Sequence, residues 1–413
     1  MKRQIVRIED ISDIKLLHEG WKNATKGDKY WRESTHNYEV NLDNNLRSLS
    51  HRLREGTWRP SSGHTFRMMT EGKWRDITSF PIEDRIVHYA VVHVFNMSRH
   101  FIRRTHGSIK GRGCLSASKQ VRKDIRNISH RVELLNKQSE KNGTAGEIFE
   151  VTVVKYDCKK FYPNILKPRL KEKIRRKYKG EAAIALLFAI IDAYMPNSER
   201  GMSIGALTSQ DMGNFFLTML DLFALENIRT HYYNRYVDDI TTLRESKAQA
   251  IAAIPRMVEA AEKDGIIFGR IEVYPLRVRR VDFCGYAVGM LNGTLSTRMR
   301  PKTVRRYCRR LHVEMKKDVS QRTPSIDQTI ASYEGIALHA DTHNLLINLK
   351  RNYYEVYRTS DRVHSAATTT RPISGLAGTS NMASRSTFSR IERKPRAPVF
   401  RLTALRAIAR SAS

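Results

Sequence analysis

The sequence is short of cysteine and of long apolar runs, and each shortage excludes a class of protein. Four cysteines stand far apart with no histidine cluster beside them, at Cys114, Cys158, Cys284 and Cys308. This argues against a disulfide framework and a structural zinc, and it favours a reducing, cytoplasmic setting. The first ten residues lack the apolar core of a signal peptide. The longest apolar stretch, Ala182 to Met195, contains Asp192 and is too short to span a bilayer. We therefore expect a buried helix there and no membrane contact.

Acidic residues are also scarce relative to basic ones. The chain has 73 Lys plus Arg against 42 Asp plus Glu, a formal charge of +31 over 413 residues. An excess of this size attracts polyanions, so it predicts a nucleic acid as partner. Apolar residues still make up 40% of the chain. That fraction suffices for large folded domains, so disorder does not explain the composition.

Two adjacent aspartates, Asp238 and Asp239, lie between two segments that read as β-strands. Neighbouring carboxylates repel each other, and their oxygens are the ligands that Mg²⁺ prefers. A solvated hairpin tip is the alternative interpretation. A further candidate strand, 148–156, ends at Asp157, which a simple strand-end turn would also explain. If that strand is a neighbour of the hairpin, three carboxylates can bridge two ions roughly 3.5–4 Å apart, as two-metal nucleotidyl transfer requires.

These aspartates and the segments around them resemble the palm of the reverse transcriptases. The similar segments, in chain order, are Lys73-x-Arg75-x-Ile77, Pro81 to Val87, Asp157-x-x-x-x-Tyr162, Gly201 to Gln210 with Asn214 and Leu217, Tyr236-Val-Asp-Asp239, and Phe283-Cys-Gly-Tyr286. The resemblance implies an α+β, right-hand polymerase fold with fingers, a palm built on an antiparallel sheet, and a helical thumb. It also implies an RNA-directed DNA polymerase that uses two Mg²⁺ ions.

The same resemblance assigns a role to each segment. Asp157, Asp238 and Asp239 would be catalytic and bind the metals, with the backbone carbonyl of Cys158 as a further ligand. The residues implied in nucleotide binding are Lys73, Arg75, Tyr162, Ile204, Gly205, Ser209 and Gln210. Those implied in primer and template binding are Tyr236, Phe283, Gly285, Tyr286, Arg305, Arg306, Arg309 and Arg310. In the family, an aromatic ring at the place of Tyr162 leaves no room for a 2′-hydroxyl and so favours deoxynucleotides; an ordinary core aromatic is the alternative.

Several departures from the family pattern narrow the subgroup. Ile204-Gly205 and Ser209-Gln210 stand where most reverse transcriptases have Gln-Gly and Ser-Pro. This pattern resembles the prokaryotic enzymes of diversity-generating retroelements and of antiviral defence. Because isoleucine cannot make the hydrogen bonds of glutamine, we expect low or unusual fidelity. Gly72 replaces the usual proline of the fingers. The lysine expected after the catalytic hairpin is missing, and Arg270, its nearest substitute, is a poor proton donor.

The motifs divide the chain into five parts. We expect a helical extension at 1–60, the fingers with part of the palm at 61–150, the palm at 151–290, a helical thumb at 291–360, and a basic tail at 361–413 that is flexible or binds RNA. In the first part, Leu42, Leu46, Leu49 and Leu53 have the spacing of one helix face. Residues 136–147 are interpreted as an insertion or hairpin turn, and 168–179 as a basic helix whose charges are solvated.

Residues 305–310 open the thumb, where arginines alternate with Tyr307. Cations suit phosphate contacts and aromatic rings stack on sugar or base, so we expect this segment to grip the product duplex. No RNase H, integrase or endonuclease extension is evident in the sequence.

The sequence therefore predicts a polymerase that copies a cognate non-coding RNA into DNA, in defence against phages. A low-fidelity enzyme of diversity generation, template-independent or protein-primed synthesis, and an inactive RNA-binding scaffold are the alternatives. The expected partners are a structured RNA template, a DNA product and dNTPs. Template, primer and oligomeric state are left open.

Overall fold

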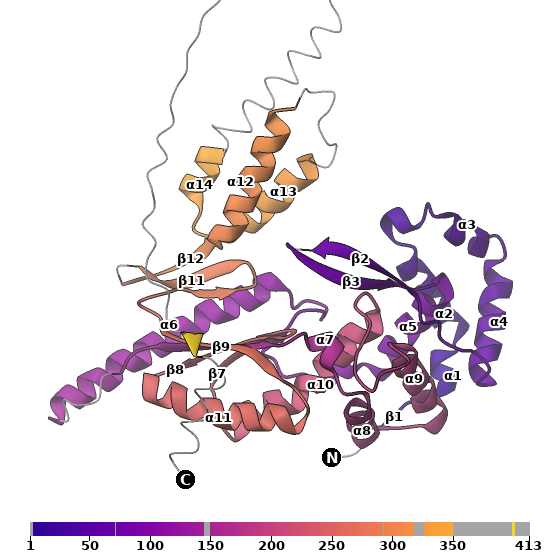
Figure 1. Cartoon of the computed structure of the whole chain (residues 1–413), viewed down its shortest axis with the longest axis horizontal. Coiled ribbons are helices and arrows are strands. Elements are labelled where there is room, and N and C mark those ends of the chain that lie inside the picture. The colour runs from indigo at the N-terminus through magenta and orange to yellow at the C-terminus, as the bar shows by residue number, and fades with distance from the viewer. Residues whose placement is uncertain are drawn as a thin grey trace, which may run out of the picture.

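The computed structural model describes residues 3–70, 72–143, 149–291, 293–317 and 326–349, and the backbone of 399–400. It has a mixed α+β architecture, in which a central sheet is flanked by helices (Figure 1). The tail expected at 361–413 lies, apart from those two residues, outside the described part of the chain.

The central sheet has six strands in the order β13-β9-β5-β8-β7-β4. Its strands are β4 (Thr105–His106), β5 (Thr152–Cys158), β7 (Tyr232–Tyr236), β8 (Asp239–Arg244), β9 (Phe268–Pro275) and β13 (Val399–Phe400). β5 pairs antiparallel with both β8 and β9, while β4 pairs parallel with β7. The β-branched run before Asp157 thus forms a central strand, as the sequence predicted.

Side chains of β5 alternate between two apolar layers because successive residues of a strand point to opposite faces. Val154 and Tyr156 belong to the core that also contains side chains of α10 (Leu207–Glu226) and α11 (Lys247–Lys263). Val151 and Val153 belong to the core under α6 (Cys114–Lys141). By the same alternation Lys155 and Asp157 continue the α6 face beyond its apolar part.

Helices of the N-terminal part pack against the palm side in one continuous core. They are α1 (Ile8–Ile11), α2 (Ile14–Ala24), α3 (Glu33–Glu39), α4 (Leu42–Arg54) and α5 (Ile82–Phe95), with 3-10 turns at Gly27–Lys29 and Met97–His100. Leu46, Leu49 and Leu53 of α4 are buried, which confirms the predicted apolar face. Because α2 packs against α5, the first 60 residues share one core with α5 and with helices that flank the central sheet, rather than forming a separate unit.

Short elements come after the strand that carries Asp157. They are α7 (Phe161–Asn164), α8 (Lys167–Lys177), β6 (Tyr178–Lys179), which pairs in parallel with β1 (Gln4–Ile5), and α9 (Glu181–Ala193). The apolar stretch from 182 forms the buried side of α9, as expected. None of the described helices is both long and apolar enough to cross a membrane.

A hairpin and a helical unit stand on the same side of the central sheet (Figure 1). The hairpin is β2 (His64–Thr70) with β3 (Lys73–Ser79). The helical unit is α12 (Pro301–Met315), α13 (Ile326–Ala337) and α14 (His343–Leu349), which lies above a three-stranded sheet of β10 (Val281–Phe283), β11 (Tyr286–Leu291) and β12 (Thr294–Met299).

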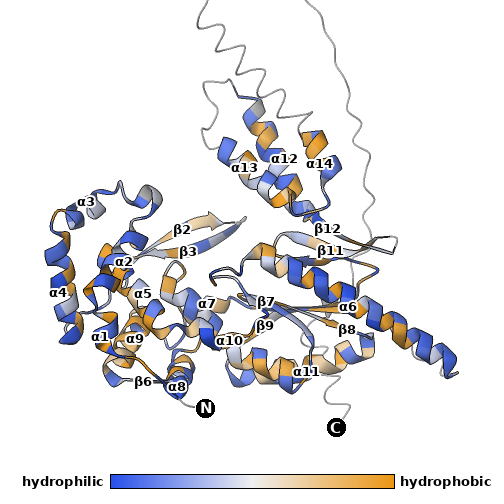
Figure 2. Cartoon of the chain, turned by 180° about the vertical axis from the view of Figure 1, so that it is seen from behind, coloured by the Kyte–Doolittle hydropathy of each residue, from blue (hydrophilic) through white to orange (hydrophobic). Residues whose placement is uncertain are grey.

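Two segments differ from the sequence prediction. The basic helix expected at 168–179 is α8, but Lys173 is buried and its Nζ donates to Asp264 at 2.6 Å, so its charges are not all solvated. Residues 136–141, interpreted as part of an insertion or hairpin, continue α6, which alternates polar and apolar residues along its length (Figure 2). Asn142-Gly143 does form a turn, as predicted, and this turn ends α6. Gly143 has a φ of 65°, the conformation that favours glycine after a helix.

Candidate active site

Strand register places Asp157 opposite Asp239. In the antiparallel pair of β5 and β8 these two residues are direct partners, and on the other side of β5 the partner of Asp157 is Arg270 of β9. Opposed residues point to the same face with Cβ atoms about 4.5–5.5 Å apart. Asp238 occupies the turn between β7 and β8. The three aspartates singled out in the sequence therefore meet at one end of the sheet.

Each of the segments around these carboxylates contains an irregularity of the backbone. The register of β5 against β9 shifts between Asp157 and Cys158, a β-bulge of the kind found beside active sites. Three non-glycine residues nearby have positive φ: Lys160 at 44°, Val237 at 54° and Cys284 at 51°. Such backbone costs on the order of 1–3 kcal/mol per residue, so surrounding contacts must hold it.

Burial and mutual repulsion raise the pKa values of the hairpin carboxylates. Burial raises the pKa of Asp238 to about 6, and the charges of Asp157 and Asp239 add to the effect. The guanidinium of Arg75 lowers the pKa of Asp238, which places this hairpin arginine near the carboxylates. Burial also raises the pKa of Asp239, against the opposing effect of Lys155.

Lys155 is a site residue that the sequence interpretation missed. Its Nζ donates to Oδ2 of Asp239 at 3.2 Å and to the backbone carbonyl of Asp282 at 2.6 Å. It thus joins the hairpin at 236–239 to β10, the strand that carries Asp282. Its position two residues before Asp157, hence on the same strand face, was the available signal.

The carboxylate oxygens have the donor chemistry that Mg²⁺ requires. Within the described ranges, however, no group of three or more His, Cys, Asp or Glu side chains is already arranged to hold a metal ion.

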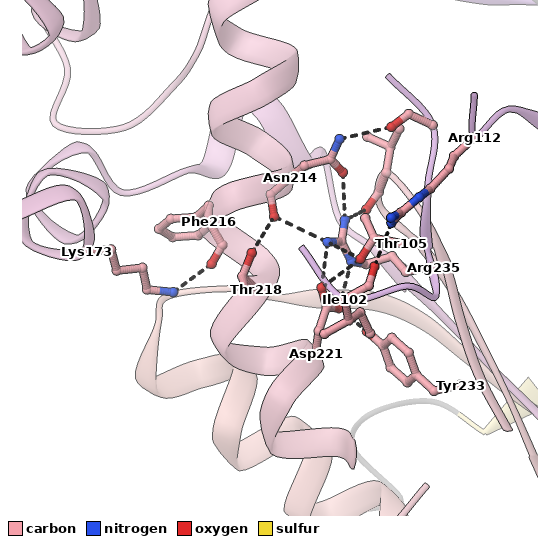
Figure 3. A network of polar contacts seen from close by, with 12 residues as sticks. Ile102, Thr105, Arg112, Lys173, Asn214, Phe216, Thr218, Asp221, Tyr233 and Arg235 are labelled. Atoms are coloured by element: carbon pink, nitrogen blue, oxygen red, sulfur yellow. Dashed lines mark hydrogen bonds and ion pairs between the residues drawn. The ribbon is translucent and has the colours of Figure 1, made fainter. Parts of the chain in front are cut away.

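A buried polar network lies behind the hairpin (Figure 3). The Arg235 side chain is fully buried, and its Nε and Nη2 each donate to a carboxylate oxygen of Asp221 at 2.7 Å. Its Nη1 donates to the backbone carbonyl of Val237 at 2.8 Å and to Oδ1 of Asn214 at 2.9 Å. Arg235 therefore holds the strained residue at the hairpin tip from behind.

Further hydrogen bonds tie this network to α10 and to the strand before α6. Tyr233 donates to Asp221 at 2.5 Å, and Nδ2 of Asn214 donates to the carbonyl of Gly107 at 3.1 Å. Asn214 belongs to one of the segments that resemble the reverse transcriptases, whereas Arg235 and Asp221 do not. They are 14 residues apart on different elements, so no local spacing signals the pair.

The predicted nucleotide loop contacts the fingers hairpin. The Thr78 N–H donates to the carbonyl of Ile204 at 2.7 Å. Gly205 has a φ of 119°, and a Cβ there would stand 2.4 Å from the carbonyl oxygen of Thr78. Only glycine fits this approach. Lys73 and Arg75 are exposed on the outer half of β3.

The other predicted nucleotide residues differ in accessibility. Tyr162 is half-buried beside Gly213, and its pKa is raised to about 12 by burial, with the charge of Asp238 adding to the effect. Gln210 is exposed. Ser209 is buried, with 1% of its surface exposed, and its role in nucleotide binding stays a prediction.

The predicted primer grip surrounds the β10–β11 turn. The side chains of Phe283 and Tyr286 are buried, and the Tyr286 hydroxyl donates to the carbonyl of Ile336 at 3.2 Å. These rings anchor the turn. The backbone of Gly285 is half-buried, and a Cβ there would meet nothing within 4 Å. Tyr236 is half-buried, with its hydroxyl 3.4 Å from Sγ of Cys114.

The thumb arginines lie on a separate element. The four predicted there, Arg305, Arg306, Arg309 and Arg310, belong to α12, and none of them is buried. Tyr307, expected to stack on nucleic acid, is instead 2% exposed and stacks on Tyr333 with ring centres 4.0 Å apart. It serves the packing of α12 on α13 and leaves the arginines on the outer side of the helix.

Comparison with known proteins adds little to this geometry. No protein-family model matches the chain, and no curated protein matches it. Among solved structures, an apo telomerase from Candida tropicalis, truncated from the C-terminal domain, is 14% identical with a TM-score of 0.39. The match covers 58% of this chain and 55% of that one, so this chain spans about half the telomerase. A similarity of this size carries no argument below.

Proposed function

We propose that the chain is an RNA-directed DNA polymerase whose catalytic centre is the end of the sheet formed by Asp157, Asp238 and Asp239. The observation that carries the proposal is the pairing of Asp157 with Asp239 across two strands, beside Asp238 in the turn. Three carboxylates offer only oxygen atoms as ligands, and this is the ligand set of a site for two Mg²⁺ ions. Bound there, the ions would activate the primer hydroxyl and stabilise the leaving pyrophosphate.

Residues of this chain supply the positioning that such a reaction needs. Arg235 holds the hairpin from behind, and Lys155 links it to the segment that ends at the β10–β11 turn. In this proposal Arg75 meets the phosphates of an incoming nucleotide, which is supported by the effect of its charge on Asp238. Tyr162 lies under the sugar and excludes a 2′-hydroxyl in the same proposal, which is supported by the effect of Asp238 on its hydroxyl. Right-hand architecture with fingers, palm and thumb belongs to the same proposal.

Our proposal for the biological role rests only on the positions at which the sequence departs from the family pattern. The Ile204-Gly205 and Ser209-Gln210 pattern favours a prokaryotic enzyme that copies one cognate non-coding RNA. Of its two settings, antiviral defence fits the altered fingers motif better than diversity generation does. Sequencing the nucleic acid that co-purifies with the chain from cells distinguishes the two settings. A single transcript that is present without phage infection favours defence, and a template that derives from a repeat favours diversity generation.

Primer extension tests the enzymatic claim. Purified chain is given dNTPs and Mg²⁺ with a primer on an RNA template, on a DNA template, or with no template. We expect products that mirror the RNA, and loss of at least about 10³-fold in rate for Asp238→Asn. Asp43→Asn, an exposed aspartate of α4, is the matched control. Products of random sequence would favour template-independent synthesis, and no product from wild type would favour a binding scaffold.

A further inference from the structure

A cavity of about 680 Å³ lies at α8 and α9, beside the N-terminal residues. None of its lining residues belongs to the candidate active site. Four of them are cationic, namely Arg3, Lys171, Arg175 and Arg176, and two of these, Lys171 and Arg175, contact the ring of Phe188. The N-terminus lies next to α8 in Figure 1, so residues far apart in sequence build this surface together.

The charges of this cavity are only partly balanced. Lys171 pairs with Asp192 at 2.6 Å, and Glu172 pairs with both Arg169 and Arg176. Within the described ranges, no carboxylate pairs with Arg175 or Arg3. Arg3 makes only a long contact of 3.5 Å to the carbonyl of Arg175. The surface therefore keeps an excess of positive charge with N–H groups directed to solvent.

Phe188 holds two of the cations in place. Nζ of Lys171 lies 5.3 Å from the ring centre, and Cζ of Arg175 lies 5.1 Å from it. A guanidinium stacked on a ring loses freedom but keeps its N–H edges for anions. Lys171 and Arg175 are one helical turn apart, about 6 Å along the axis. The two residues thus follow each other in a row along α8, while both side chains contact the same ring.

We propose that this cavity is a second nucleic-acid site, which binds the phosphate backbone of a single strand outside the active site. A row of cations can follow successive phosphates, whereas one compact anion would use only part of it. Because Phe188 is occupied by Lys171 and Arg175, the contact is to backbone and independent of sequence. The inference rests on the proposed function in one respect: the strand held there is the template RNA.

Binding of two labelled RNAs to the full chain tests the site. One is a long unstructured strand, and the other is a short primer–template whose overhang ends within the active site. We expect Arg175→Glu to weaken binding of the long strand about tenfold or more, and to reduce the slope of log affinity against log salt by about 0.7 for each lost contact. Binding and extension of the short primer–template should not change.

Lys247→Glu is the matched control, because Lys247 is exposed at the start of α11 and the charge change is the same. Arg175 is also exposed, so the thermal midpoint of its variant should equal that of wild type. Tripolyphosphate, titrated separately, distinguishes a strand from a free anion. If Arg175→Glu loses tripolyphosphate binding but keeps the long strand, the site takes a small anion and the proposal is overturned.

The outcomes for the second site and for the polymerase can be told apart. If wild type extends primers and Arg175→Glu binds the long strand as Lys247→Glu does, the second site is wrong while the polymerase stands. If no primer is extended but Arg175→Glu still loses the strand, the polymerase is wrong while the site stands.

Discussion

The two sides of the hairpin at 236–239 carry opposite electrostatic arrangements. Behind it, Arg235 and Asp221 are wholly buried, and each charge is matched and hydrogen-bonded. In front, Lys155 donates a hydrogen bond to one of the three carboxylates, that of Asp239. Balanced charge behind the hairpin holds its backbone in place, whereas the charge in front is only partly balanced. Carboxylates a few residues apart in this fold thus differ in how fully their charge is matched.

Breaking the rear network should have the largest effect. Arg235→Met leaves Asp221 buried without its cation, which we expect to lower the free energy of unfolding by about 3–5 kcal/mol. Urea denaturation measures it. The double variant Arg235→Met, Asp221→Leu should recover much of the stability, since no lone charge remains, but not the polymerase activity, because Val237 loses its donor. Recovery of both would contradict the positioning role.

Asp211 offers a third case, a buried carboxylate whose burial raises its pKa to about 7. The folded state therefore binds the proton more tightly than the unfolded state, and stability falls as pH rises from about 4 to about 7. We expect Asp211→Asn to abolish that loss, gaining roughly 2–4 kcal/mol at pH 8 and nothing below about pH 4. Unfolding curves across this range check it. An equal gain at all pH values would show that charge is not the cause.

Removing the cation in front should affect catalysis more than folding. Lys155→Met frees Asp239 from the carbonyl of Asp282, and a small misplacement of reacting groups costs up to about 100-fold in rate. We expect kcat for primer extension to fall about 10- to 100-fold with a smaller change in KM for dNTP. Lys137→Met, on the exposed face of α6, is the control. An unchanged kcat with lower stability would make Lys155 purely structural.

Disturbing the contact between the loop at Gly205 and the β2–β3 hairpin should have the smallest effect. Gly205→Ala sets a Cβ against the carbonyl of Thr78, so we expect KM for dNTP to rise severalfold and stability to fall by about 1–2 kcal/mol. Gly72→Ala is the control that introduces backbone strain without a steric clash, because Gly72 also has a positive φ but no atom within 4 Å of an added Cβ. Equal effects on KM from both variants would remove the loop contact from the explanation.

Local patterns of the sequence predicted the features that depend on neighbours along the chain. The strand ending at Asp157, the hairpin at 238–239 and the apolar face of α4 follow from periodicity and turn residues, and the structure has all three as elements. The meeting of Asp157 with Asp239 required strand order, which periodicity does not contain. Resemblance to a family supplied that order as an expectation, and the register agrees with it.

Burial and tertiary partners could not be predicted in this way. Motif matching gave Phe283, Tyr286 and Tyr307 roles toward nucleic acid, but their rings pack inside the chain. The pair of Arg235 and Asp221 forms only when α10 and β7 come together. A motif reports which residues share a role, and it does not report which side chains face solvent.

Manganese binding tests the central claim most directly, since Mn²⁺ takes the same oxygen ligands as Mg²⁺ and is visible by electron paramagnetic resonance. The chain is titrated in the presence of dNTP and a chain-terminated primer on RNA. The account predicts two ions per chain with a spin–spin coupled signal, which is lost in Asp157→Asn and in Asp238→Asn and kept in Asp43→Asn. The same number of bound ions in wild type and in a variant lacking all three carboxylates would contradict it.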